Sequence, residues 1–277
     1  MRRPQLLAIC ALMMVLITGS RPGAGAQQLP HALWVWSHPE PGLARFARAH
    51  DFTRLLVNVP TDDAGSAAFV RLARAARRRN IELLAVSGHP SWALAPAGMA
   101  SWVRQTRRAD LYAGLLLDIE PYTLDEWHTD IGRTRLMRGY LRALKRAARG
   151  AGDLPVWAAV PFWFDHDAYR FDGRSLLEHV LERVEGIVVM AYRDSAAGND
   201  GILSHTFGEI VAGAAAGKPV MIGVQTAPDE LDKLTFHEEG AGAMEGELDA
   251  VRKALTGAPG FGGIAVHHLD SYRHLRP

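Results

Sequence analysis

Eight short apolar runs recur along this chain, and amphipathic stretches separate each run from the next. The runs are mostly continuous rather than alternating in polarity, which is typical of parallel strands covered on both faces of a sheet. They occupy 32–36, 54–59, 81–86, 112–120, 155–160, 186–192, 219–224 and 261–266. This pattern predicts one α/β domain, a (β/α)8 TIM barrel. Because the chain ends soon after the last run, we expect the eighth helix to be short or absent.

A doubly wound open sheet is the alternative architecture for the same pattern. No Gly-x-Gly-x-x-Gly follows the first strand, however, which argues against a dinucleotide-binding fold of that kind. Helical spacing of apolar residues predicts the intervening helices. We expect them over 41–49, 67–79, 99–108, 134–149, 174–184, 207–216 and 242–255.

Residues 1–26 have the pattern of a secretory signal peptide. Arg2 and Arg3 form a charged start, and residues 6–17 form an apolar segment that is short for spanning a bilayer. The segment closes on Ala-Gly-Ala, a small-x-small cleavage site. We therefore expect the barrel domain to be 27–277, and the mature protein to be periplasmic or secreted, without stable membrane insertion.

Charge and cysteine content narrow the chemistry of the mature chain. Cys10, the only cysteine, leaves with the leader, so we expect neither disulfides nor thiolate chemistry. Removing the three arginines of the leader from 31 basic residues leaves 28, against 30 acidic ones, a net charge of about −2. This charge argues against nucleic acid as a partner. We interpret the basic run 77–79 as the solvated end of a helix, where cations suit the helix dipole.

The fourth apolar run ends in two acidic residues, Asp118 and Glu120, just before Pro121 stops the strand. Residues two apart on a strand point to the same side, so two carboxyl groups emerge side by side. In a (β/α)8 barrel, the carboxyl end of the strands is where active sites are built. A purely structural pair, salt-bridged or capping a helix, is the alternative interpretation.

Closure of the barrel would bring other strand ends to the same mouth. We take Tyr192 as a further candidate catalytic residue. The candidate substrate-binding residues are Trp36, His89, Tyr122, Trp163, Asp165, Arg193, Gln225, His267 and Asp270. Aromatic side chains can stack on sugar rings while a few polar groups fix their orientation, which points to a carbohydrate substrate. We assign Trp34 and Phe162 to the core instead.

Three short motifs resemble family 18 glycoside hydrolases, the chitinase-like barrels. The stretch Asp118-Ile119-Glu120 looks like the last half of that family's Asp-x-x-Asp-x-Asp-x-Glu signature on strand four. The stretch 190–192, Met-Ala-Tyr, is similar to its Met-x-Tyr on strand six, and 262–267 resembles its final strand. The order and strand positions of the motifs agree over nearly the whole mature chain. Segments 235–240 and 267–272 also look like those of uncharacterised secreted bacterial barrels.

The chain departs from the family pattern at four positions. Ala113 and Leu116 stand where the signature has its two earlier aspartates. His267 stands at the position of the final tryptophan, and Arg193 at a position where aspartate is common. The departures make chitin itself a doubtful substrate.

The resemblance implies a secreted glycoside hydrolase with Glu120 as general acid. Large two-glutamate barrels carry their nucleophile at the end of strand seven, where this chain has Gln225. The resemblance therefore implies that the substrate's own 2-acetamido oxygen attacks, with Asp118 orienting that group and Tyr192 hydrogen-bonding it. An inverting route, with Asp165 or Asp270 as the base for water, stays open.

Two other functions stay open. The chain could be a sugar-binding barrel that kept the groove and lost the chemistry. It could also be a metal-dependent hydrolase in which His267, His268 and Asp270, with His89 or His38, bind zinc. Adjacent histidines on a strand point to opposite faces, so only one of the pair would face the mouth. We therefore expect no metal and no other cofactor.

Overall fold

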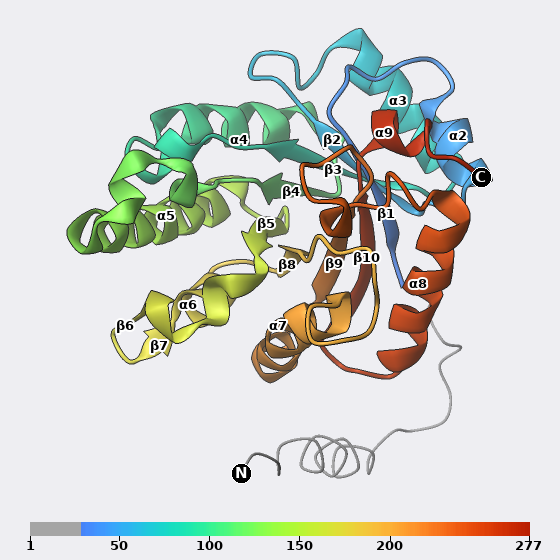
Figure 1. Ribbon diagram of the computed structural model, residues 1–277. Helices are drawn as coiled ribbons and strands as arrows, with labels where there is room; N and C mark the ends of the chain where they lie inside the picture. Colours follow the sequence, from blue (N-terminus) through green and yellow to red (C-terminus); the bar gives the residue numbers. More distant parts are fainter. Residues whose placement is uncertain (1–28) are drawn as a thin grey trace, which may run out of the picture.

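The computed structural model describes residues 29–277, and the predicted leader lies outside these residues. Eight strands close into a barrel in the spatial order β1, β10, β9, β8, β5, β4, β3 and β2, and every neighbouring pair is parallel (Figure 1). The strands are β1 (His31–Val35), β2 (Arg54–Asn58), β3 (Glu82–Ser87), β4 (Gly114–Leu117), β5 (Val156–Pro161), β8 (Gly186–Met190), β9 (Val220–Gln225) and β10 (Phe261–His267). The predicted (β/α)8 barrel is therefore confirmed.

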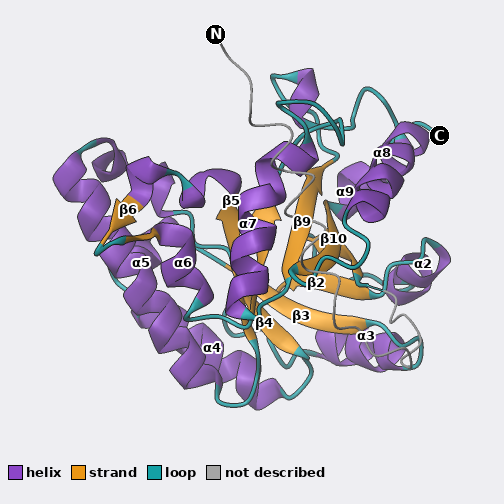
Figure 2. Cartoon of the chain, turned by 90° about the horizontal axis from the view of Figure 1, so that it is seen from below, coloured by secondary structure: helices purple, strands orange, loops and turns teal. Residues whose placement is uncertain are grey.

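Helices surround the barrel, as the view from below shows (Figure 2). They are α2 (Leu43–Ala49), α3 (Ala67–Arg77), α4 (Ala97–Ala109), α5 (Asp130–Ala151), α6 (Leu176–Leu181), α7 (Ile202–Ala216), α8 (Ala241–Ala254) and α9 (Leu269–Tyr272). The last helix has only four residues, as the early end of the chain predicts. In residues 29–277 there is no helix with both the length and the apolar character to span a bilayer.

A short hairpin corrects one predicted helix. We expected a helix over 174–184, but β6 (Arg170–Phe171) pairs with β7 (Arg174–Ser175) before the helix begins. The turn between the two strands uses residues with positive φ, 49° at Asp172 and 79° at Gly173. Ser175 then starts α6 through a capping box with Glu178. Local turn and capping chemistry therefore overrides the helical spacing there.

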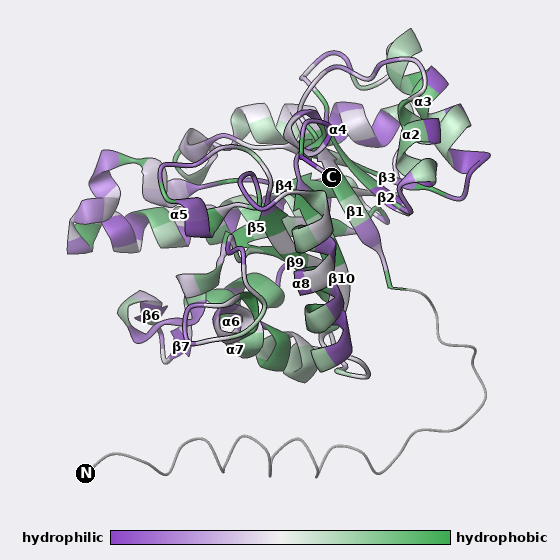
Figure 3. Ribbon diagram, turned by 45° about the vertical axis from the view of Figure 1, so that its right-hand side comes forward, coloured by the Kyte–Doolittle hydropathy of each residue, from purple (hydrophilic) through white to green (hydrophobic). Residues whose placement is uncertain are grey.

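Side-chain alternation divides the core into two parts. Inside the barrel, one cluster of buried side chains includes Trp34, Leu56, Leu116, Trp157 and Val188. The larger cluster lies between the strands and the helices that cover them. Apolar residues accordingly line the strands, while the helices carry polar outer faces (Figure 3). Both clusters are needed in a barrel, because each strand is buried on two faces.

The barrel interior is filled rather than hollow. Trp157 spans it near the amino ends of the strands, where Arg54 lies over its ring at 5.2 Å. A Cβ on Gly186 would lie 2.5 Å from that ring, so the neighbouring strand needs glycine at this close approach. This floor leaves the carboxyl ends of the strands as the open end of the barrel.

Candidate active site

Strand parity places the acid pair at the mouth. Leu116 belongs to the cluster inside the barrel, and Asp118 and Glu120 continue its side of the chain two and four residues further on. Ile119, between the two acids, is buried in the outer cluster against the helices. β4 ends at Leu117, so both acids follow the strand, and they lie close enough together for Glu120 to raise the pKa of Asp118.

Asp118 lies in an environment that favours its neutral form. Burial, and then the adjacent Glu120, raise the pKa of Asp118 to about 7. Its Oδ1 is shielded from solvent and has no hydrogen-bond partner within the described residues. A Cβ on Gly88 would lie 1.7 Å from the carbonyl oxygen of Asp118, so the residue that follows β3 must be glycine to leave room for Asp118, the residue that follows β4. The two strand ends thus fix the backbone of Asp118.

Three tyrosines surround the acid pair. The Tyr122 hydroxyl donates a hydrogen bond to Oε1 of Glu120. Burial raises the pKa of Tyr122, Tyr140 and Tyr192, and the two acidic groups raise all three further. The phenols therefore stay protonated at neutral pH and can serve as hydrogen-bond donors towards the carboxylates or a bound ligand.

Tyr140 is a site residue that the sequence did not reveal. It lies on α5, is fully buried, and its hydroxyl has no partner within the described residues. Its position among the buried residues of α5 follows the apolar spacing of the helix, so it looks like an ordinary core residue. The one available signal was a phenol on a helix face that otherwise carries Leu136, Met137, Leu141 and Leu144.

His267 forms a fixed network at the centre of the mouth. Trp36 Nε1 donates to His267 Nε2 over 2.7 Å, and an indole N–H can only donate. The proton of the imidazole is therefore on Nδ1, which donates to Gln225 Oε1, also at 2.7 Å. Burial, and then His268, lower the pKa of His267 to about 3, so the ring is neutral. It stacks against Tyr192 with ring centroids 5.8 Å apart.

The network limits what His267 can do. Both ring nitrogens are already engaged, so the side chain can neither ligate a metal nor carry a proton without breaking one of these hydrogen bonds. Gln225, at the position of a second carboxylate in two-glutamate barrels, is likewise engaged with His267. Among residues 29–277, no group of three or more metal-ligating side chains is arranged to hold an ion.

A cluster of aromatic rings continues the site from Tyr122 along one side. Trp163 lies 5.1 Å from Tyr122, 6.1 Å from Trp127 and 4.7 Å from Tyr169, measured between ring centroids. Trp127 is buried, whereas Tyr122 and Trp163 are partly accessible. The accessible rings could take part in stacking on a ligand, and the buried Trp127 packs against Trp163. Trp34 and Phe162 pack in the core, as expected.

Two other predicted residues lie further from the acid pair. His89 is exposed after β3, where its Nδ1 is 2.7 Å from Ser91 Oγ. Asp270 is also exposed, on α9, and its Oδ1 is 3.4 Å from Ser37 Oγ. Neither side chain contacts the acid pair, and their binding roles stay predictions.

Asp165 and Arg193 face the helix layer. A Cβ on Gly208 would lie 2.2 Å from Asp165 Oδ2, so Asp165 packs against α7. Arg193 Nε binds Asp200 at 2.8 Å, and its guanidinium lies over the Phe162 ring at 5.4 Å. The structure therefore joins Asp118, Glu120, Tyr122 and Tyr192 into one site, while Asp165 and Arg193 lie to its side.

The fold is a (β/α)8 barrel of the kind found in family 18 glycoside hydrolases. No protein-family model and no curated protein sequence matches this chain. Several solved structures, however, have a similar fold. A chitinase from Chromobacterium violaceum superposes with a TM-score of 0.58 at 11% identity, over 88% of this chain and 96% of that one.

Two further solved structures show the same architecture. The spore cortex-lytic enzyme SleL from Bacillus megaterium has a TM-score of 0.58 at 12% identity, over 90% of this chain and 72% of that one. A family 18 chitinase from Cycas revoluta, in complex with (GlcNAc)3, has a TM-score of 0.51 at 16% identity, over 86% of this chain and 95% of that one. At such identities the likeness establishes the fold.

Proposed function

We propose that this chain is a secreted glycoside hydrolase that cleaves a glycosidic bond in an oligosaccharide or polysaccharide, with Glu120 as the general acid. The observation that carries the proposal is the pairing of Glu120 with Asp118 at the carboxyl end of the barrel, where Glu120 accepts a hydrogen bond from the Tyr122 hydroxyl. The glycan-active proteins that share this fold support it. The leader pattern of residues 1–26 is the basis for expecting export.

The acid pair can supply the proton that glycosidic cleavage needs. With a pKa of about 7, Asp118 keeps its proton below neutral pH, so the two adjacent carboxyl groups retain a proton that can reach Glu120. Tyr122 already binds Oε1 of Glu120, so the other oxygen must protonate the leaving group. Departure of that group leaves an oxocarbenium-like sugar that a nucleophile must then capture.

No carboxylate stands at the strand-end position from which two-glutamate barrels supply their nucleophile, because this chain has Gln225 there. Gln225 cannot act as one, and its amide is held by His267. Attack by the substrate's own 2-acetamido oxygen fits best. Asp118 would then orient and stabilise the acetamido group, and the protonated Tyr192 would donate a hydrogen bond to it. Asp165 is turned towards α7 and Asp270 is exposed, which makes an inverting route through either of them less well supported.

Substitution of Glu120 tests the proposal. The purified mature protein is screened against bacterial and fungal glycans, and new reducing ends are measured. Glu120→Gln keeps the shape and the hydrogen bond to Tyr122 but cannot donate the proton, so turnover should fall by about 10²–10⁴-fold or more. Glu185→Gln, at an exposed position just before β8 and so at the amino end of the barrel, serves as the matched control and should leave turnover unchanged. Wild-type turnover in Glu120→Gln would refute the assignment.

A sugar-binding barrel without catalysis is the second candidate. It is favoured by Ala113, Leu116 and His267, which replace family residues around the acid pair. This alternative expects no turnover of any glycan by the wild type. It also expects Glu120→Gln to retain the glycan affinity of the wild type, measured by calorimetric titration.

A further inference from the structure

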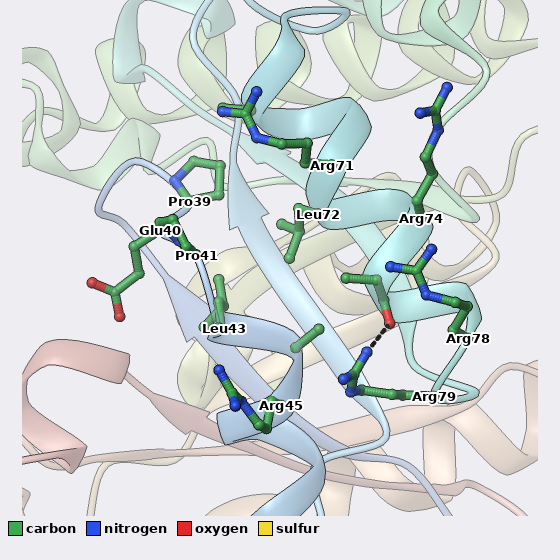
Figure 4. A pocket seen from close by; sticks show the side chains of 14 residues that line it. Pro39, Glu40, Pro41, Leu43, Arg45, Arg71, Leu72, Arg74, Arg78 and Arg79 are labelled. Carbon is green, nitrogen blue, oxygen red and sulfur yellow. Dashed lines mark hydrogen bonds between the residues drawn. The ribbon is translucent and has the colours of Figure 1, made fainter.

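A groove on the outside of the barrel lies between α2 and α3, away from the acid pair. It encloses a cavity of about 500 Å³ (Figure 4). Its floor is apolar, formed by small and aliphatic side chains, and its edge near the mouth comes from the loop after β1. Its lining includes Glu40, Leu43, Leu72 and several arginines. Nothing in the proposed hydrolytic reaction uses this groove.

Five arginines border the groove, which is a strong concentration of one charge for a chain with nearly balanced charges. Arg71, Arg74 and Arg78 follow one another at spacings of three and four, so they share one face of α3 and its end. Arg45 faces them from α2, and Arg79 joins them at the end of α3, where its Nη1 donates to Ala75 O over 3.1 Å. Arg77, by contrast, turns away and donates to the carbonyl of Asp110.

No acid neutralises this cluster. Across residues 29–277, no carboxylate lies within ion-pairing distance of any of the five groove arginines. Glu40 is the one acid in the lining, and it is engaged 2.5 Å from Arg273 instead. Like charges this close together repel, so an anion in the groove would relieve an unfavourable field.

We propose that the groove binds an anionic polysaccharide through its carboxylate, sulfate or phosphate groups. Guanidinium groups present planar forks of N–H donors that match such oxyanions in bidentate fashion. A linear chain fits a groove that runs between two helices, with guanidinium groups spaced along its length. The site would hold the protein on an anionic polymer independently of the chemistry at Glu120.

Two other anionic partners fit the groove less well. Single-stranded nucleic acid binds by stacking its bases on aromatic side chains, and no aromatic residue lines this groove. A lipid surface is bound by basic residues together with apolar side chains that insert into it. The large hydrophobic residues exposed in the described part of the chain, such as Leu94, Ile131 and Phe207, all lie outside the groove.

Titration with matched polymers tests the proposal. The mature protein is titrated with polygalacturonate, dextran sulfate and neutral dextran at low salt, and affinity is measured by calorimetry. The two anionic polymers should bind and neutral dextran should not. The triple variant Arg71→Gln, Arg74→Gln, Arg78→Gln should weaken binding by roughly tenfold or more, because three exposed ion contacts are lost.

A charge-matched variant separates the groove from general charge. Arg142→Gln, Lys145→Gln, Arg146→Gln removes three exposed cations from α5 and should change affinity less than about twofold. Unchanged melting temperatures of both triple variants show that they fold. Arg45→Gln, on the α2 side of the groove, should weaken binding by less than the triple variant on α3 does. Equal losses in the two triple variants, or no binding to either anionic polymer, would overturn the proposal. So would tighter, groove-dependent binding to an oligonucleotide or to anionic phospholipid vesicles.

Discussion

Asp118→Asn should make the protein more stable at neutral and alkaline pH while impairing catalysis. The unfolded chain releases the Asp118 proton near its ordinary pKa of 3.8, whereas the folded protein keeps it to about 7. Between these values the folded state binds more protons than the unfolded state, so the free energy of unfolding falls as pH rises. Asparagine has no titrating proton, so the free energy of unfolding of the variant lacks this decrease with rising pH.

The size of the effect follows from the pKa difference. Each unit is worth about 1.4 kcal/mol, so a rise from 3.8 to about 7 amounts to at most about 4 kcal/mol above pH 7. The free energy of unfolding of the variant, minus that of the wild type, should therefore increase by up to about 4 kcal/mol from pH 4 to pH 8. Differences in packing or hydrogen bonding between Asp and Asn do not depend on pH, and they cancel in this comparison.

Urea denaturation at half-unit pH steps, followed by circular dichroism, measures this difference directly. Asp153→Asn, an exposed position with no ion pair in the described part of the chain, removes the same charge and should give a flat profile. Turnover by Asp118→Asn should fall, because the acetamido group loses the side chain that orients it. A stability difference for Asp118→Asn that does not change between pH 4 and pH 8 would refute the raised pKa and the proton-sharing argument.

Two further predictions concern groups outside the acid pair. Burial, and then Asp165, raise the pKa of Glu209 on α7 to about 9, so Glu209→Gln should raise the free energy of unfolding at pH 7 by up to about 3 kcal/mol, with turnover unchanged. Urea denaturation measures the stability of Glu209→Gln, and the reducing-end assay measures its turnover. No gain in stability at pH 7 would contradict the raised pKa of Glu209. Because both ring nitrogens of His267 are engaged, prolonged incubation with EDTA should leave activity unchanged. Loss of activity that a divalent ion restores would instead support a metallohydrolase.

Strand periodicity made much of the barrel predictable. Continuous apolar runs mark strands buried on both faces, and their number and spacing indicate eight parallel strands with helices between them. Parity along the strand predicted over 112–120 then puts Asp118 and Glu120 on the side of Leu116, which lies inside the barrel. These are properties of the chain over a few residues, so they can be read without knowing which strands become neighbours.

The same sequence patterns could not predict features that depend on turn geometry or on tertiary contacts. The helix expected over 174–184 begins only at Leu176, because a two-residue hairpin turn and the capping box of Ser175 decide its start. The spacing of apolar residues on α5 could not distinguish Tyr140 from a core residue, although closure of the barrel brings it near the acid pair.

The sequence by itself determined the eight strands of the barrel, most of the helices between them and the residues at the strand ends. Only the tertiary structure decided the contacts between distant segments. Trp36 and His267 are 231 residues apart, and their hydrogen bond exists because β1 and β10 close the barrel side by side. The packing of α2 on α3 likewise sets Arg45 opposite Arg78. The physical reason is that backbone periodicity acts over a few residues, whereas hydrogen-bond partners, pKa values and clusters of charge depend on which segments become neighbours in space.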